Sequence, residues 1–179
     1  MTYAEKSHLK RCLYVLLLII FVVVLGVANV VYVDESGVNK AFYRAFGRAK
    51  AGGRVHGTVP GKRCRRKNII AGLWGKKHVA VQCYEHSTTS LFFEDWFEFE
   101  LLAAIPEFSL IIMDNATFHR KKRIFKIAER HNVFVLFLPP YSPDLNPIEK
   151  SWANFKRWLC DNFKRFPNLQ WAAECYFEK

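Results

Sequence analysis

At 179 residues, the chain is long enough for one compact domain with a sizeable core, and it leaves little room for a second domain. Its net charge of +11 favours a polyanionic partner, because Lys and Arg side chains that neutralise phosphates release condensed counterions. The five cysteines are scattered, with no CxxC pair and no histidine at zinc-finger spacing, which argues against a disulfide framework or a zinc site.

The first predicted element lies in an apolar run from Leu13 to Val33, which has no charged residue and follows a basic start. Such a run is about long enough to span a bilayer, and it also imitates a secretory signal. Alternatively, residues 29–35 form the first strand of a sheet, after a buried helix or strand. We favour the strand, because the acidic motifs downstream are more specific than hydropathy. Residues 1–28 are then an atypical apolar N-terminal segment.

A basic stretch follows, from Ser36 to Tyr84, with twelve Lys or Arg residues and no Asp or Glu. This is uneven for a surface that is merely solvated, although a solvated hairpin is the alternative. Within the stretch, residues 41–47 and 68–86 have β-branched and aromatic residues with Gly-bearing turns, which predicts antiparallel strands. A run of basic side chains between them is predicted to contact DNA phosphates: Lys62, Arg63, Arg65, Arg66 and Lys67.

Helices and strands alternate in the second half of the chain. Residues 88–105 begin with Thr and Ser caps and end before Pro106, which predicts a helix. Its expected apolar positions are Leu91, Trp96, Phe99, Leu102 and Ala103. The remaining predicted elements are a strand at 109–113, a helix at 118–131, a strand at 133–138 and a final helix from Pro147. The apolar stripe of this final helix is expected at Ile148, Trp152, Phe155 and Leu159. Hairpins followed by this βαβα pattern predict an α/β fold with a mixed sheet flanked by helices.

Three acidic residues stand at points where such a fold places reactive groups. Asp34 closes one apolar run, and Asp114 follows a strand predicted to be buried on both faces, at its carboxyl end. In the final helix, Asn146 suits the N-cap and Pro147 the first helical position, so Glu149 lies in the first turn. Singly, each acid could be a turn or capping residue. Together they outline a divalent-metal site, since hard cations need oxygen ligands.

The motifs that carry these acids resemble those of a known family. DESG (34–37), DNATFH (114–119) and PPYSPDLNPIEKSW (139–152) have the order and spacing of the acidic triad of mariner-superfamily DDE transposases. The likeness is greatest to bacterial transposases of the insertion-sequence 630 family. It implies a ribonuclease-H-like (retroviral-integrase-like) DDE catalytic domain at residues 29–166, followed by a truncated C-terminal tail at 167–179.

The resemblance also implies chemistry, cofactors and partners. Asp34 is expected to bridge two Mg²⁺ ions, with Mn²⁺ as a substitute, while Asp114 binds one ion and Glu149 the other. Asn115 and His119 flank the Asp114 turn, where they could bind a phosphate or orient the cleaved strand. The substrate is double-stranded DNA at transposon ends and targets, and the active enzyme is expected to be a homo-oligomer in the cytoplasm, at the nucleoid.

The family likeness implies a helix-turn-helix region that reads the element's ends, for which this chain has no space. We therefore expect either a partner reading frame that carries it, or a truncated copy. The rival interpretation is a membrane-anchored or secreted protein with a decayed, inactive DDE domain. Glu35, next to Asp34, is expected to point to the other face of the strand and to be structural.

Overall fold

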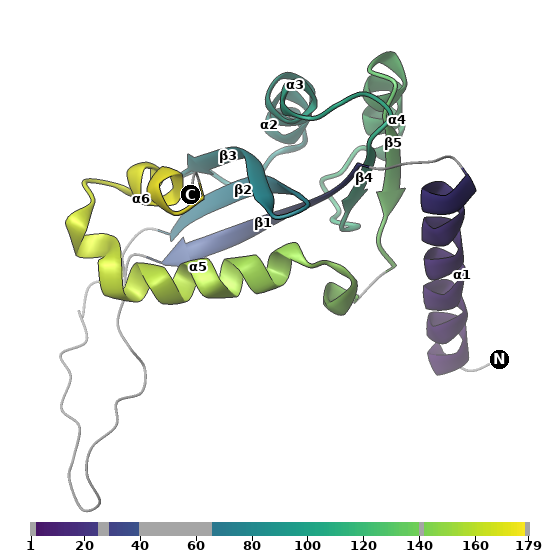
Figure 1. Ribbon diagram of the computed structural model, residues 1–179, viewed down its shortest axis with the longest axis horizontal. Coiled ribbons are helices and arrows are strands. Elements are labelled where there is room, and N and C mark those ends of the chain that lie inside the picture. Colours follow the sequence, from purple (N-terminus) through teal and green to yellow (C-terminus); the bar gives the residue numbers. More distant parts are fainter. Residues whose placement is uncertain (1–2, 25–28, 40–65, 140–141, 178–179) are drawn as a thin grey trace, which may run out of the picture.

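The computed structural model describes residues 3–24, 29–39, 66–139 and 142–177. They form a five-stranded mixed sheet in the order β3-β2-β1-β4-β5, with helices on both faces (Figure 1). The β1–β2 and β2–β3 pairs are antiparallel, and the β1–β4 and β4–β5 pairs are parallel. The strands are β1 (Val30–Asn39), β2 (Arg66–Trp74), β3 (Lys77–Tyr84), β4 (Leu110–Met113) and β5 (Phe134–Phe137). The predicted fold class is confirmed, and the predicted strand at 41–47 lies outside the described residues.

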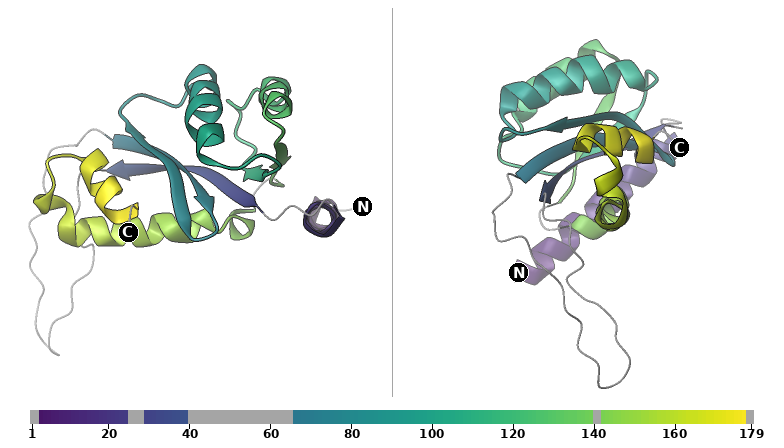
Figure 2. Two further views of the ribbon diagram at one scale, coloured as in Figure 1. Left: turned by 45° about the horizontal axis from the view of Figure 1, so that its top comes forward. Right: turned by 90° about the vertical axis from the view of Figure 1, so that its left-hand side faces the viewer.

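The helical elements cover the sheet from both sides (Figure 2). They are α1 (Tyr3–Val24), α2 (Ser90–Asp95), the π-helical η1 (Trp96–Leu101), α3 (Leu102–Ala104), α4 (Lys121–Arg130), the 3-10 helix η2 (Pro143–Leu145), α5 (Ile148–Asn162), the 3-10 helix η3 (Phe163–Arg165) and α6 (Leu169–Phe177). On one face, α2, η1, α3 and α4 enclose the larger core. On the other face, α5 and α6 pack over β1, β2 and β3, while α1 packs over β4 and β5.

Alternation along β1 assigns its side chains to these two faces. Val31 and Val33 belong to the core beneath α2 and α4, whereas Tyr32 lies on the α5 side. The period of two continues beyond the apolar residues, so Asp34 shares a face with Tyr32, and Glu35 shares a face with Val33. The strand therefore directs its two adjacent acids to opposite sides of the sheet, as predicted for Glu35.

The helix predicted at 88–105 is present, but its buried face differs from the prediction. Leu91 and Phe99, predicted to be apolar contacts, are 64% and 69% exposed, whereas Phe93, Phe97 and Leu101 are buried. For Phe99 the reason is the π-helical segment from Trp96 to Leu101. A π turn holds about one more residue than an α turn, so residues from this segment onward depart from a period of 3.6. Leu91 lies before this segment, in α2, and the π turn does not explain its exposure.

The apolar N-terminal run divides between two elements. Its last residues enter β1, as the favoured interpretation predicts, and the preceding residues form α1. Tyr14 is buried and Leu18 partly buried against β4 and β5, so α1 packs against the domain. The expectation of a buried helix holds for this side alone, because Leu13, Leu16 and Ile19 are exposed. In the described ranges, no helix combines the length and apolar character needed to cross a membrane.

The C-terminal residues assigned to a tail are part of the folded core. They form α6, whose Leu169, Ala172 and Ala173 are buried against the β1–β3 side of the sheet. Gln170 adds a polar anchor, since its side-chain oxygen accepts a hydrogen bond of 3.0 Å from the backbone N–H of Cys83 in β3. Among the described residues, Cys12, Cys83, Cys160 and Cys175 form no disulfide.

Two carboxylates of the α2–η1 helix form ion pairs with residues of α4 and its ends, and they differ in burial. Glu94, only 5% exposed, accepts hydrogen bonds of 2.6 Å from both Nε and Nη2 of Arg120. Glu98, whose side chain is 20% exposed, pairs with Arg130 at 2.9 Å. Removing the partner of a buried carboxylate leaves an uncompensated charge, which is costly, whereas a more exposed carboxylate is solvated.

We therefore expect Arg120→Met to lower the melting temperature by several degrees more than the matched variant Arg130→Met. The Arg123 guanidinium, at 3.5 Å from Glu94, should compensate only in part. Thermal unfolding followed by circular dichroism would measure both shifts. Equal shifts would show that the burial of Glu94 does not determine the strength of its ion pair.

Candidate functional site

The sheet brings two of the three predicted acids side by side. Val33 of β1 is paired with Met113 of β4 in parallel register, so Asp34 and Asp114 occupy the next position on neighbouring strands. Both line one pocket of about 440 Å³. Asp34 does not end its strand, contrary to the sequence prediction. β4 stops at Met113, but β1 runs on to Asn39, because β2 continues to pair with it.

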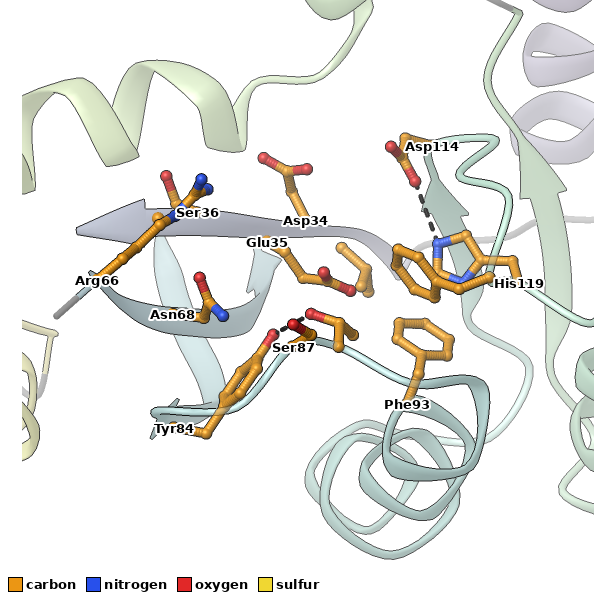
Figure 3. Close-up of a pocket in the computed structure, with 14 residues that line it drawn as sticks. Asp34, Glu35, Ser36, Arg66, Asn68, Tyr84, Ser87, Phe93, Asp114 and His119 are labelled. Carbon is orange, nitrogen blue, oxygen red and sulfur yellow. Dashed lines mark hydrogen bonds and ion pairs between the residues drawn. The ribbon is translucent and has the colours of Figure 1, made fainter. Parts of the chain in front are cut away.

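Asp114 is held by the turn that follows it. Its Oδ1 accepts hydrogen bonds from the backbone N–H of Ala116 at 3.2 Å and from His119 Nε2 at 3.1 Å (Figure 3). Burial raises the pKa of Asp114, but the hydrogen bond and charge of His119 and the Ala116 bond outweigh it and hold that pKa below its usual range. The turn therefore keeps the Asp114 side chain ionised and fixed in direction.

His119, predicted as a supporting residue, is buried beside Asp114. Its ring lies 4.2 Å from that of Phe93 and 4.3 Å from that of Phe118, measured between centroids. Its Nδ1 is buried without a hydrogen-bond partner in the described part of the chain. Asn115, the other predicted support, is exposed and does not line the pocket. The structure thus brings His119, and not Asn115, to the site.

Asp34 is less exposed to solvent than Asp114. Its Oδ2 accepts a hydrogen bond of 3.0 Å from Trp152 Nε1 of α5. Burial raises the pKa of Asp34 to about 7, and the charges of Glu149 and Asp114 act in the same direction. The hydrogen bonds from Trp152 and from the backbone N–H of Glu35 oppose this rise. Three carboxylates therefore interact electrostatically, and a cation between them would relieve their repulsion.

Glu149 lies in the first turn of α5 and is exposed. It acts on the pKa of Asp34, but it does not line the pocket. Among the described residues, no group of three or more His, Cys, Asp or Glu side chains is arranged closely enough to hold a metal ion. The structure thus brings Asp34 and Asp114 together, and a metal site completed by Glu149 remains a prediction.

The start of α5 differs from the predicted cap. Pro147 takes the N-cap place with helical φ and ψ of −59° and −25°, and no side chain caps the helix. The first turn begins with a backbone hydrogen bond instead, because the Asn146 carbonyl accepts a hydrogen bond of 3.2 Å from the backbone N–H of Glu149. The Asn146 side chain is buried, and its Oδ1 has no partner among the described residues, so the predicted capping bond is absent. The predicted apolar stripe of α5 is confirmed: Ile148, Trp152, Phe155 and Leu159 are buried.

Comparison with known proteins identifies the family. Residues 29–170 match the family described as "DDE superfamily endonuclease". The chain belongs to this family. An uncharacterized protein of Sinorhizobium fredii is 33% identical over 63 residues, which cover 34% of this chain and 44% of that protein.

Solved structures similar to this chain support the fold. The Mos1 mariner paired-end complex with Mn has a TM-score of 0.74 at 18% identity, covering 99% of this chain and 56% of that one. The Mos1 transposase paired-end complex with left transposon end gives 0.70 at 18% identity, over 89% and 50%. The catalytic domain of Mos1 mariner transposase gives 0.67 at 14% identity, over 99% and 82%. This chain spans about half the length of the Mos1 transposase chains in the complex with the left transposon end and in the strand transfer complex.

Trp152 contacts the candidate site, although the sequence analysis assigned it only to the apolar stripe of the helix. Its indole is 1% exposed and donates to Asp34, and it lies three residues after Glu149 on the same helix. Behind it, Ser151 Oγ and His78 Nε2 are 2.6 Å apart, and the His78 ring lies 4.2 Å from that of Phe177, between centroids, in a tilted arrangement. Aromatic packing between β3, α5 and α6 thus fixes the tryptophan that bonds Asp34.

The buried His78 gives the stability of this protein a testable pH dependence. Burial lowers the pKa of His78 to about 4, whereas its unfolded value is close to 6.5. The unfolded chain binds the proton first as the pH falls, so the stabilisation is complete above pH 6.5 and is lost as the pH falls through 4. Between pH 7 and pH 5, the advantage of wild type over His78→Gln in unfolding free energy should shrink by roughly 1–2 kcal/mol.

Urea unfolding of both proteins at the two pH values measures this difference. Glutamine is neutral throughout and can accept the Ser151 hydrogen bond, so the other titrating groups cancel in the comparison. A difference that stays constant with pH would show that His78 titrates normally in the folded state.

The predicted basic cluster is only partly described. Lys62, Arg63 and Arg65 lie outside the described residues, while Arg66 and Lys67 begin β2. Lys67 forms an ion pair of 2.6 Å with Glu85, whereas Arg66 lines the pocket that contains Asp34 and Asp114. The two neighbouring cations are therefore not equivalent, because Lys67 is paired with an acid and Arg66 lines the pocket.

The sequence analysis did not predict the polar wall on the Glu35 side of the pocket. Glu35 lines it, and burial raises its pKa to about 7, although a hydrogen bond from Thr88 opposes the rise. Thr88 Oγ1 lies 2.7 Å from the hydroxyl of Tyr84. Asn68 and Ser87 complete this polar wall. No local signal marks these residues, because the β2–β3 register and the loop before α2 bring them together.

Proposed function

We propose that this chain is the catalytic domain of a transposase that cleaves and joins DNA strands with divalent metal ions, as in the insertion-sequence 630 family. The observation that carries the proposal is the placement of Asp34 and Asp114 at matching positions of two parallel strands, in one pocket, with the charge of Glu149 acting on Asp34. Family membership supports the cleavage chemistry, and the similar Mos1 structures are transposase complexes with transposon ends.

The donor set fits a hard divalent cation such as Mg²⁺ or Mn²⁺. Asp34, Asp114 and Glu149 offer carboxylate oxygens, which are the ligands that such ions prefer. The Ala116 and His119 bonds engage Oδ1 of Asp114, so its Oδ2 is left to face the pocket. When bound, the metal ions would activate a water or a 3′-hydroxyl and stabilise the charge that develops on the phosphate.

The protein's own groups have distinct tasks in this proposal. Trp152 holds Asp34 through one carboxylate oxygen, and His119 with Ala116 holds Asp114, so both acids are oriented before DNA binds. Glu149 would complete the metal ligands from the first turn of α5. Double-stranded DNA is the proposed partner, and the net charge of +11 supports it. We further propose that a helix-turn-helix partner frame and a homo-oligomer form the active complex at the nucleoid.

The test is cleavage of DNA carrying the element's ends, with Mg²⁺, with Mn²⁺ and with a chelator, in the presence and absence of the partner frame. Metal-dependent nicking supports the proposal. A homogeneous folded protein that binds neither metal nor DNA would overturn it. Nothing in the described residues favours the membrane-anchored alternative.

A further inference from the structure

The pocket of about 440 Å³ extends well beyond the two metal-binding candidates. Figure 3 shows Asp34 and Glu35 pointing to opposite sides of β1, with Tyr84 and Ser87 on the Glu35 side. Besides Asp34 and Asp114, the lining includes hydroxyl, amide and aromatic groups from β2, β3 and the loop before α2. A volume of this size lies within the range of about 300–1,000 Å³ that is typical of small-molecule sites. The metal-binding acids thus occupy one side of a larger polar cavity.

The polar wall of this cavity is organised by its own hydrogen bonds. Glu35, Thr88 and Tyr84 are linked by hydrogen bonds: Thr88 bonds to the Glu35 carboxyl, and the Thr88 and Tyr84 hydroxyl oxygens are 2.7 Å apart. Asn68 Nδ2 donates to the carbonyl of His86 at 2.8 Å, which fixes the amide beside them. These bonds hold donors and acceptors in place before any ligand arrives, as expected of a binding site.

Arg66 supplies a cation on the same lining. Its guanidinium lies across Gly37, where an added Cβ would come within 2.0 Å of Arg66 Nε and 2.1 Å of Nη2. Glycine at position 37 therefore permits this close approach. Arg66 has no acidic partner among the described residues, in contrast to Lys67, which pairs with Glu85. An unpaired guanidinium on a polar pocket is suited to a phosphate, which it can bind through two parallel hydrogen bonds.

We propose that this pocket binds one nucleotide of the DNA strand next to the phosphate that is cleaved, with Arg66 on that nucleotide's own phosphate and the Glu35–Thr88–Tyr84 wall beside its sugar and base. The proposal rests on the proposed DNA-cleaving function of Asp34 and Asp114. Since these acids and Arg66 line the same cavity, a strand whose scissile phosphate lies at the acids can extend an adjoining nucleotide toward Arg66. The cavity thereby determines where the DNA strand lies along β1.

The probe is a thymidine dinucleotide with a 5′-phosphate, titrated into ¹⁵N-labelled protein in Mg²⁺ buffer and followed by ¹H–¹⁵N NMR. Saturable shift changes are expected at the amides of Gly37, Asn68 and Thr88. Arg66→Gln should weaken binding about tenfold, because it removes a charge-assisted phosphate contact. Gly37→Ala should weaken it in the same direction with the charge retained, since the new methyl group displaces the guanidinium.

Lys77→Gln is the matched control, because it removes the same charge from an exposed position at the opposite end of the β2–β3 hairpin. It should bind the dinucleotide as wild type does. Shift changes confined to other surfaces, or wild-type affinity in Arg66→Gln, would overturn the pocket assignment.

Cleavage of duplex DNA by wild type, measured in parallel, separates the two hypotheses. Dinucleotide binding at the pocket by a protein that fails to cut DNA even with the partner frame would count against the transposase function alone. Cutting by wild type, combined with unaltered dinucleotide affinity in Arg66→Gln and Gly37→Ala, would count against the nucleotide pocket alone.

Discussion

Asp114→Asn should abolish metal-dependent DNA nicking while DNA binding stays intact or becomes stronger. The change removes one negatively charged ligand, so its effect should exceed the roughly 10- to 100-fold loss that follows removal of an outer-shell partner. The same change reduces the repulsion between the site and DNA phosphates. The asparagine carbonyl can still accept the Ala116 and His119 hydrogen bonds, so the turn and the fold should persist.

The experiment compares nicking and DNA affinity in wild type, Asp114→Asn and Asp144→Asn. Asp144 is a fitting control because it is exposed, pairs with Arg11 and lies outside the pocket. Binding of Mn²⁺, followed by electron paramagnetic resonance, gives a second readout that does not depend on cutting. Wild-type nicking by Asp114→Asn would show that the active site does not lie at the carboxyl end of β4.

Trp152→Phe should reduce nicking by roughly 10- to 100-fold, with a smaller effect on folding. Phenylalanine keeps most of the buried ring but loses the N–H that bonds Asp34, and a hydrogen bond to a charged group is worth about 1.5–3 kcal/mol. Trp152→Ala should in addition lower the unfolding free energy by about 3–5 kcal/mol, because it leaves a cavity beneath α5. The two variants therefore separate the orientation of Asp34 from packing.

Urea unfolding and the Mg²⁺ dependence of nicking are the measurements. A misoriented Asp34 should raise the metal concentration needed for half-maximal nicking, a shift that loss of packing alone would not produce. Trp158→Phe serves as the control, since Trp158 lies on the same helix and packs against Phe155, Phe166 and Tyr176. Wild-type metal dependence in Trp152→Phe would show that its N–H does not position Asp34.

The parts of this fold that could be predicted from sequence are those with a local cause. The apolar runs before Asp34 and Asp114 predicted β1 and β4, and the family motifs predicted that the two acids would meet. The apolar stripe of α5 followed from the spacing of Ile148 and Trp152. In each case a short stretch of chain determines which side chains are buried. The spacing of apolar residues, with a period of 2 in a strand or 3.6 in a helix, is then sufficient to predict the element.

The remainder depends on contacts between distant residues. The end of β1 is set by its pairing with β2, so the position of Asp34 within the strand could not be deduced from its own neighbours. The π-helical turn after Asp95 departs from a period of 3.6, so Phe99 lies at the surface. The wall made by Glu35, Thr88 and Tyr84 exists only once the hairpin and the loop before α2 are in register.

Helix α5 carries both Glu149 and the tryptophan that holds Asp34. In the proposed mechanism, a chain in which this helix has not docked would lack one of the proposed metal ligands, and Asp34 would lose the bond that fixes its direction. Docking of α5 onto the sheet, and not formation of the sheet alone, is therefore expected to complete the proposed site.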